Sequence, residues 1–372
     1  MQMRQPMAML GGCSPVQFMR EYWQRKPLLI RQAIPGVVAP LHRAALFELA
    51  ACADVESRLV QRVGAQWSVR EGPLPRRSFP TIATPNWSLL VQGLDLHVDA
   101  AHELLSRFRF VPDARLDDLM MSWASHGGGV GPHLDSYDVF LLQVQGRRRW
   151  RIARGDDDAF VEGLPLRILQ RFEPEEEWLL EPGDMLYLPP RWAHDGVAIG
   201  ECMTCSIGFR APASGSLANE LMLRLGEDAL DLDTTLYRDA AQAATSHPGA
   251  IPASLQRHAQ RVVMRALRRP GAMARALGET LTEPKPQVWF AATHSRDVAQ
   301  GVRLAKASRM MYDSRFCFIN GDSFAAGGRD AMLMHVLADT RRLDAETCRL
   351  LSPAARRTVQ QWLESGWLES IK

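Results

Sequence analysis

The stretch from about residue 116 to residue 210 limits the fold of this chain more than any other feature. Glycine, proline and aspartate separate its short apolar runs, which are residues 119–124, 137–144, 149–152, 185–188 and 203–209. Parallel strands need long crossover connections, usually helices, and no helix of that length fits between these runs. Short strands at close spacing are typical of an antiparallel sandwich or barrel. The stretch therefore predicts a double-stranded β-helix, or jelly roll.

The residues before this stretch predict a mixed α and β segment. Ser14 followed by Pro15 is typical of a helix start, because a serine caps the first turn and proline is tolerated at the first helical position. Leu28–Ile30 predicts a short strand, and residues 41–52 have the apolar spacing of a second helix. With the β-rich stretch, they give a predicted first domain of residues 1–212.

A helical region is predicted next, over residues 213–281. It is rich in Ala, Leu and Arg, and the segments with helical periodicity are residues 217–225, 255–267 and 272–281. A helical block this short must cover its apolar faces either on the sandwich or on a second copy of itself. We expect the second arrangement, a homodimer.

The last predicted domain covers residues 282–372 and begins with the proline-containing linker Thr282–Pro286. Two strands and two helices are predicted in it, at residues 302–312, 316–325, 332–343 and 354–362. Strands and helices in under a hundred residues favour a winged-helix module. The predicted fold class of the whole chain is therefore α+β: a jelly roll, a helical region and a C-terminal winged-helix domain.

Composition adds few constraints. Lys and Arg number 44 and Asp and Glu 42, so the net charge of +2 indicates neither a nucleic-acid nor an acidic partner. No window of about 18 uninterrupted apolar residues predicts a membrane span, no export signal is present, and we expect a cytoplasmic protein. Cys202 and Cys205 have metal or redox spacing, but neither a second pair nor a helix start accompanies them. We expect ordinary strand residues there.

Three residues in the β-rich stretch predict a metal site. His133 and Asp135 are two positions apart and share one face of a strand or extended loop. Asp184–Pro190 predicts a turn, a strand and a proline stop, which would bring His194 to the same end of the barrel. Two imidazoles and one carboxylate on one face are the facial triad of non-haem Fe(II) oxygenases, although zinc or nickel could bind the same ligands.

An oxygenase of this kind needs a cation for the distal carboxylate of a cosubstrate such as 2-oxoglutarate, and arginine suits this role by its planar fork. The run Gly146–Ile152 offers several arginines. Because side chains alternate along a strand, Arg148 shares the inward face of the apolar Trp150 and Ile152. Arg148 is therefore predicted inside the barrel, and the neighbouring Arg147, Arg149 and Arg151 toward solvent or substrate.

The glycine run Gly127–Gly131 has two interpretations. Glycine-rich loops bind phosphates at helix N-termini, but this run leads into a strand and lacks the Gly-Lys-Ser/Thr word, which disfavours nucleotide binding. Flexible close approach to a substrate is the preferred interpretation.

Several sequence motifs of this chain closely resemble those of the bacterial ribosomal oxygenases of the Jumonji-C, cupin-like superfamily. The stretch from Asp117 to Trp150 is the most specific part, above all Gly127–Phe140 and Gly146–Trp150. Further motifs that support the resemblance are Tyr22–Pro27, Thr84–Gln92 and Ser206–Pro212, so it covers most of the first 212 residues.

The resemblance implies a Jumonji-C catalytic domain in residues 1–212, a helical dimerisation region in residues 213–281 and a winged-helix domain in residues 282–372. It also implies an activity. The chain would be an Fe(II)- and 2-oxoglutarate-dependent dioxygenase that uses O₂ to hydroxylate the β-carbon of an arginine in large-subunit ribosomal protein sixteen.

Site residues follow from the same resemblance, position by position. His133, Asp135 and His194 match the iron ligands, Arg148 matches the 2-oxoglutarate anchor, and Ser122 resembles a second cosubstrate contact. The chain departs from the family at Thr204, where asparagine is frequent near the metal. Tyr137, on the face of His133 and Asp135, is a candidate to stack on the substrate guanidinium, although a core aromatic role fits it equally well.

Two alternatives remain open at this point. An N-methyl lysine or arginine demethylase would use the same iron site and release formaldehyde. A non-catalytic regulator would sense iron or oxygen with the barrel and bind DNA with the winged helix. The predicted helices of the last domain mix Asp and Glu with their arginines, so we expect no direct DNA binding.

Overall fold

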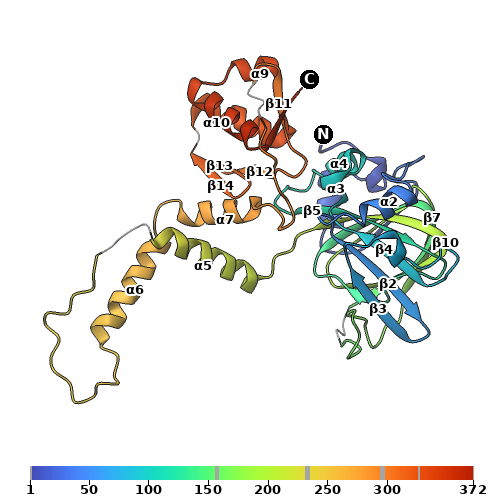
Figure 1. Ribbon diagram of the computed structural model, residues 1–372, viewed down its shortest axis with the longest axis horizontal. Coiled ribbons are helices and arrows are strands. Elements are labelled where there is room, and N and C mark those ends of the chain that lie inside the picture. The colour runs from blue at the N-terminus through green and yellow to red at the C-terminus, as the bar shows by residue number, and fades with distance from the viewer. Residues whose placement is uncertain (1, 156–158, 231–234, 294–297, 326, 372) are drawn as a thin grey trace. The chain divides into compact units, whose positions relative to one another are not determined.

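The computed structural model describes residues 2–155, 159–230, 235–293, 298–325 and 327–371. It divides into two compact units, residues 1–211 and residues 212–372 (Figure 1). No helix in the described part of the chain is both long enough and apolar enough to cross a membrane.

The first unit is built around one ten-stranded antiparallel sheet that folds back on itself. Its strands are β1 (Leu28–Ile30), β2 (Ser57–Val63), β3 (Gln66–Glu71), β4 (Trp87–Val91), β5 (Leu116–Ala124), β6 (His133–Leu134), β7 (Asp138–Arg154), β8 (Glu176–Leu180), β9 (Met185–Leu188) and β10 (Trp192–Phe209). Its helices are η1 (Ala8–Leu10), α1 (Pro15–Glu21), α2 (Arg43–Leu49), η2 (Arg76–Ser78), α3 (Leu94–His97) and α4 (Asp99–Ser106).

The long strands β7 and β10 belong to both halves of the barrel. The first half of β7 pairs with β9 and with the end of β10, in the sheet ordered β1-β9-β7-β10-β5-β4-β2-β3. The second half of β7 pairs with β8 and with the start of β10, which also carries β6. Two sheets that share their central strands form a double-stranded β-helix, so the predicted jelly roll is confirmed.

Gly146 is the point where β7 passes from one half to the other. Its φ of 63° is left-handed, a conformation that glycine adopts without strain. A Cβ there would lie 2.1 Å from the carbonyl oxygen of Glu201, so the crossing strand leaves no room for a side chain. On β10 the register shifts between Ile199 and Met203, opposite this bend.

The two faces of the main sheet pack differently. One face carries Phe140, Tyr187 and Phe209, which are fully buried against Phe18 and Trp23 of the N-terminal segment. The hydroxyl of Ser14 caps α1 by accepting a hydrogen bond from the N–H of Gln17, as predicted. The other face lines the barrel interior with Val139, Leu141, Leu186 and Leu188.

A buried carboxylate joins several segments behind the barrel. Asp138, at the start of β7, is fully buried and accepts hydrogen bonds from Tyr187 Oη at 2.7 Å, Gln24 Nε2 at 3.0 Å and Arg115 at 3.1 Å. Burial, and then the charge of Asp138, raises the pKa of Tyr187 far above its ordinary value, so the phenol stays protonated and donates. The network fixes the start of β7 against β9 and the N-terminal segment.

The second unit contains helices and two small sheets. Its helices are α5 (Ser214–Leu230), α6 (Ala253–Leu267), α7 (Ala272–Thr282), α8 (Gly328–Thr340), α9 (Ala345–Arg349) and α10 (Pro353–Glu364). Its strands are β11 (Gly301–Leu304), β12 (Met310–Tyr312), β13 (Phe316–Ile319), β14 (Asp322–Ala325), β15 (Arg342–Asp344) and β16 (Leu368–Ser370). The sheets β15-β11-β16 and β12-β13-β14 share one apolar core with α8 and α10, so the winged-helix prediction is confirmed.

Most predicted elements form, with a few differences. The runs predicted as two strands at residues 137–144 and 149–152 are one continuous strand, β7. The single strand predicted at residues 302–312 is wrong, because β11 and β12 lie in different sheets. Cys202 and Cys205 are buried, free strand residues on β10, as expected.

Candidate metal centre

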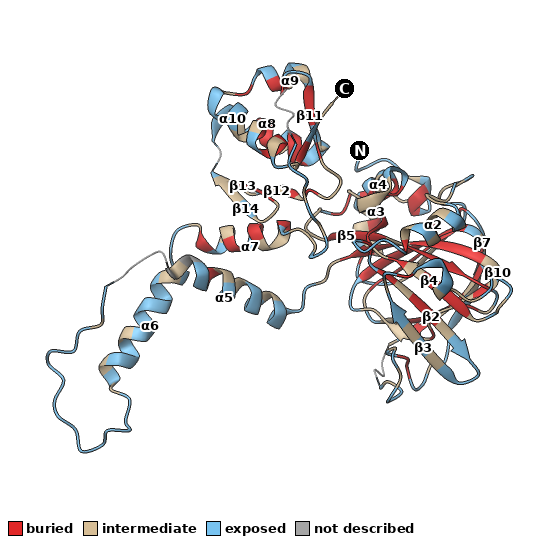
Figure 2. Cartoon of the chain, in the orientation of Figure 1, coloured by how far each residue is buried: buried red, intermediate tan, exposed pale blue. Residues whose placement is uncertain are grey.

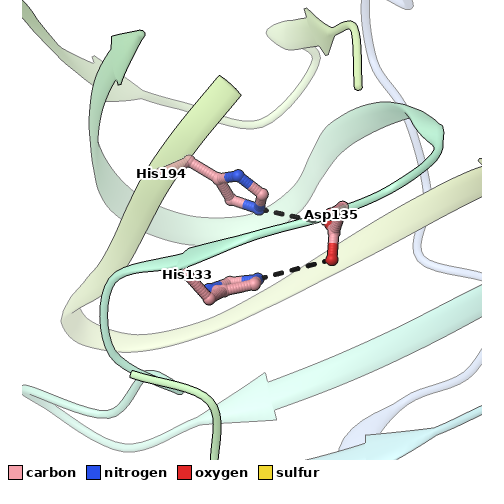
Figure 3. A group of neighbouring side chains, drawn as sticks. All are labelled: His133, Asp135 and His194. Atoms are coloured by element: carbon pink, nitrogen blue, oxygen red, sulfur yellow. Dashed lines mark ion pairs between the residues drawn. The ribbon is translucent and has the colours of Figure 1, made fainter. Parts of the chain in front are cut away.

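The structure brings His133, Asp135 and His194 together at one end of the barrel (Figure 3). His133 is on β6 and lies opposite His194 of β10 in the strand register, and Asp135 directly follows β6. Nε2 of His133 is 4.0 Å from one carboxylate oxygen of Asp135, and Nε2 of His194 is 3.5 Å from the other. The three ligand atoms lie within 4.8 Å of one another, the arrangement of a three-residue metal site.

Backbone carbonyls orient both imidazole rings. Nδ1 of His133 lies 2.8 Å from the carbonyl oxygen of Gly131, and Nδ1 of His194 lies 2.9 Å from that of Trp192. A carbonyl can only accept, so each Nδ1 carries the proton in the neutral ring and each Nε2 keeps a free lone pair. Both lone pairs belong to the atoms nearest Asp135. Fixing the tautomer through the other ring nitrogen is how proteins prepare metal-binding histidines.

His194 is held neutral by its surroundings. Only 3% of its side chain is exposed, against 25% for His133 and 19% for Asp135. Burial, and next the neighbouring His133, lowers the pKa of His194 to about 4. A neutral imidazole is the form that binds a metal.

The glycine run before His133 packs tightly against two strands. A Cβ on Gly128 would lie 2.4 Å from the carbonyl oxygen of Trp87, and one on Gly129 would lie 2.5 Å from that of Gly196. Glycine therefore lets this loop lie against the backbones of β4 and β10 and deliver His133 to His194. The loop continues into β6 and not into a helix, which agrees with the case against nucleotide binding.

The alternation predicted for the arginine run is confirmed. Arg148 is 6% exposed and lies on the face of the buried Trp150 and Ile152, whereas Arg147 is exposed and Arg149 is half-buried on the opposite face. On the paired strand, His194 faces Ile152 and Ala198 faces Arg148. Arg148 and His194 therefore point into the same barrel.

Arg148 has no anionic partner in the described part of the chain. Its Nε is buried without a hydrogen-bond acceptor, and no carboxylate of a described residue forms an ion pair with its guanidinium. The guanidinium carbon of Arg148 lies 5.5 Å from the centroid of the Trp150 ring. A buried, unpaired cation is costly, so an anion inside the barrel would stabilise this side chain.

Ser122 and Thr204 lie opposite each other on β5 and β10, and both are buried. The Thr204 hydroxyl donates to Oε1 of Gln143 at 2.9 Å, and Gln143 is fully buried on β7. Sequence reasoning missed Gln143, because it lies within an apolar run and its partner is 61 residues away. The three residues add a polar patch to the barrel interior.

Tyr137 lies between Asp135 and the start of β7 and is 40% exposed. Its partial burial, followed by the charges of Asp135 and Asp118, raises the pKa of its phenol far above the ordinary value. The side chain is therefore a neutral aromatic group beside the triad. It does not belong to the apolar core.

Comparisons with known proteins agree with this site. Residues 103–217 match the family model of the JmjC domain, and residues 259–369 match that of the ROXA-like winged helix. The ribosomal protein uL16 3-hydroxylase of Escherichia coli (strain K12) is 33% identical over 276 residues, which are 73% of this chain and 72% of that protein. A probable ribosomal oxygenase of Haemophilus influenzae is 39% identical over 209 residues, 55% of this chain and 51% of that protein.

Solved structures show the same likeness over nearly the whole length. The X-ray structure of E. coli YcfD superimposes with a TM-score of 0.83 at 28% identity, covering 95% of this chain and 96% of that one. A structure of YcfD, a ribosomal oxygenase, in complex with cobalt and 2-oxoglutarate gives a TM-score of 0.80 at the same identity and coverage. Sequence, fold and site geometry thus agree, and the chain belongs to the ribosomal oxygenase family of JmjC-domain, 2-oxoglutarate-dependent oxygenases.

Proposed function

We propose that this protein is an Fe(II)- and 2-oxoglutarate-dependent dioxygenase that hydroxylates the β-carbon of an arginine in ribosomal protein uL16. The proposal rests on one observation: Arg148, which is buried and has no anionic partner among the described residues, lies in the same barrel as the two histidines and one aspartate. The two histidines and the aspartate would bind a metal, and Arg148 would bind an anionic cosubstrate. Such an enzyme requires both.

The donor set fits iron. His133 and His194 would each bind through Nε2 and Asp135 through a carboxylate oxygen, which leaves positions for cosubstrate and gas on an octahedral ion. A structural zinc site would more often use four protein ligands, and no fourth His, Cys, Asp or Glu joins this group among the described residues.

The interior fits a dicarboxylate. Arg148 would bind the distal carboxylate of 2-oxoglutarate through its planar fork, and the Ser122 hydroxyl would donate a further hydrogen bond. When bound, iron and 2-oxoglutarate would supply the oxidation, in which one oxygen atom of O₂ enters the new hydroxyl group and the other enters succinate, with release of CO₂. The chain's own residues supply position, charge and a largely apolar barrel that limits the access of water.

The substrate assignment rests on the relatives. The E. coli relative is named for hydroxylation of uL16 at position 3, which is the β-carbon of an amino acid. Arginine as the target follows from the family resemblance of the sequence, and Tyr137 would stack on its guanidinium beside Asp135. Membership of an oxygenase family favours an enzyme over a non-catalytic regulator, and a ribosomal substrate would place the protein in the cytoplasm.

We further propose that α6 takes part in a homodimer. Leu255, Ala259, Val262 and Ala266 follow one another at spacings of four, three and four, so they form one apolar stripe on this helix. Val262 is 52% exposed, and α6 buries no residue in the described structure (Figure 2). An uncovered apolar stripe of this kind marks an interaction surface, and a second copy of the same helix offers a matching stripe.

Replacing one metal ligand tests the triad. Substituting a residue that only hydrogen-bonds to a metal ligand lowers metal affinity roughly 10–100-fold. His133→Ala removes a ligand itself, so it should lower the affinity for Fe(II) or Co(II) by more than this and should abolish succinate formation. Metal titration followed by calorimetry measures the first effect. His126→Ala is the matched control, because His126 is exposed on the same approach and lies outside the triad. Normal turnover in His133→Ala would reject the assignment.

Arg148→Met tests the cosubstrate anchor while keeping the length and apolar character of the side chain. Loss of two charge-assisted hydrogen bonds, each worth about 1.5–3 kcal/mol, should raise the KM for 2-oxoglutarate by about 100-fold or more. Arg147→Met, on the opposite face of β7, should leave that KM unchanged. An unaltered KM in Arg148→Met would contradict the assignment.

Mass spectrometry tests the reaction itself. Ribosomal proteins incubated with the iron-loaded enzyme, O₂ and 2-oxoglutarate should gain the mass of one oxygen atom on a single arginine peptide of uL16. His133→Ala enzyme is the negative control. Formaldehyde release with loss of a methyl group would instead indicate a demethylase.

A charge in the apolar stripe tests the dimer. Val262→Asp should convert a dimer into a monomer in analytical ultracentrifugation, because a carboxylate in a buried interface is strongly disfavoured. Arg257→Asp, on the opposite side of α6, should stay dimeric. A monomeric wild-type protein, or a dimeric Val262→Asp variant, would refute the proposal.

A further inference from the structure

The outer face of the β7–β10 pair carries a second set of arginines that the reaction leaves unused. Arg149 and Arg151 alternate with the inward-facing residues of β7, and they lie opposite Val197 and Asp195 of β10. Together with Arg62 of β2 and Trp67 of β3, these four residues line a cavity of about 200 Å³. The glycine run before His133 completes its wall.

The charge of this cavity, which we call the outer pocket, is positive. Arg62, Arg149 and Arg151 contribute three guanidinium groups and Asp195 one carboxylate, which forms an ion pair with Arg151. The Nε atoms of Arg149 and Arg151 are buried and have no hydrogen-bond acceptor in the part of the chain that the structure describes. Arg62 stacks on the Trp67 ring, with its guanidinium carbon 5.5 Å from the ring centroid. Two arginines therefore remain for a ligand, beside an indole wall.

The outer pocket is adjacent to the metal centre but separate from it. Its wall includes Pro132, which precedes His133, and Asp195, which follows His194. Successive side chains of a strand point to opposite faces, so the pocket lies on the outer side of the strand that carries His194 inside. β6, which carries His133, pairs only with β10 in the described sheet and is two residues long. A polypeptide that passed over this short strand would have the triad on one side and the outer pocket on the other.

The surroundings favour one compact anion over a polyanion. On β8, Glu177 lies opposite Arg151 and Leu179 opposite Arg149, on the same outer face. Glu173 and Glu175, which precede β8, are also exposed. A nucleic-acid backbone that followed the outer face would meet Glu177 and these two carboxylates, whereas a single carboxylate on a peptide would fit between the arginines without meeting them.

We propose that the outer pocket is a substrate-docking subsite that binds the carboxylate of one Asp or Glu side chain of the protein substrate. The carboxylate is bound by Arg149 and Arg62, with the acidic side chain's methylene groups against Trp67. This inference rests on the proposed function, in that a polypeptide is the substrate. It adds a specificity determinant outside the barrel.

Kinetics with full-length, iron-loaded enzyme and purified uL16 test the subsite. Arg149→Gln should raise the KM for uL16 roughly tenfold or more, as expected for one lost charge-assisted interaction. Arg62→Gln should act in the same direction. Arg147→Gln is the matched control, because Arg147 lies on the same strand and face but outside the pocket. The KM of this variant for uL16 should stay within about twofold of the wild-type value.

The partner residue is found by neutralising the acidic residues of uL16 one at a time, as Asp→Asn or Glu→Gln. One such substrate should show the same rise in KM with wild-type enzyme and no further rise with Arg149→Gln, since both changes remove one interaction. Unchanged KM in both Arg149→Gln and Arg62→Gln would overturn the subsite. Salt-sensitive binding of single-stranded RNA that Arg149→Gln abolishes, with KM for uL16 unaffected, would overturn it in favour of nucleic acid.

Direct binding separates failure of the subsite from failure of the proposed function. The indole N–H signal of Trp67, assigned by Trp67→Phe, should shift saturably in NMR spectra on addition of N-acetylglutamate N-methylamide. The glutamine analogue should cause no shift, and Arg149→Gln should abolish the effect. If uL16 is not turned over, this measurement alone decides the pocket, and absence of the shift would refute it.

Discussion

The pairing of β7 with β10 is the interaction on which the rest of the structure depends. It runs from the pair of Trp192 with Arg154 to the pair of Phe209 with Asp138, and both strands serve both halves of the barrel. A slip of one residue in this register would move Arg148 or His194 to the outer face, because side chains alternate with a period of two. Gly146 and the register shift opposite it let both strands turn without losing that order.

The sequence predicts those parts of the site that depend on local geometry. Choosing Arg148 from a run of arginines needs only the apolar Trp150 and Ile152 and the alternation of a strand, and both are visible without a structure. The spacing of His133 and Asp135 is equally local. His194 is a harder case, since its place depends on β10 returning beside β6, but the preceding turn, strand and proline stop already indicate the end of the barrel at which it arrives.

What the sequence could not predict depends on contacts between distant residues. An aspartate at the start of a strand is expected to be exposed to solvent. Asp138 is nevertheless fully buried, because Gln24, Arg115 and Tyr187 from three separate segments form hydrogen bonds with it. The hairpin of β2 and β3 was not predicted, since most of its residues are polar and only three of them, all on β2, are buried. The division of β7 into two predicted strands has a local cause, because the glycine at residue 146 has the signature of a turn and is in fact a bend within one strand.

The arginines at residues 147–151 of β7 therefore lie in different environments. Arg147 is exposed to water, which screens its charge, and Arg151 is neutralised by Asp195. Arg148 and Arg149 are left without a carboxylate partner among the described residues, one facing the barrel and one facing the outer pocket. Adjacent like charges repel each other, and an anion bound to either arginine would relieve that repulsion for both. Cosubstrate in the barrel would therefore reduce the positive potential in the outer pocket, and an anion in the pocket would in turn reduce the positive potential around Arg148.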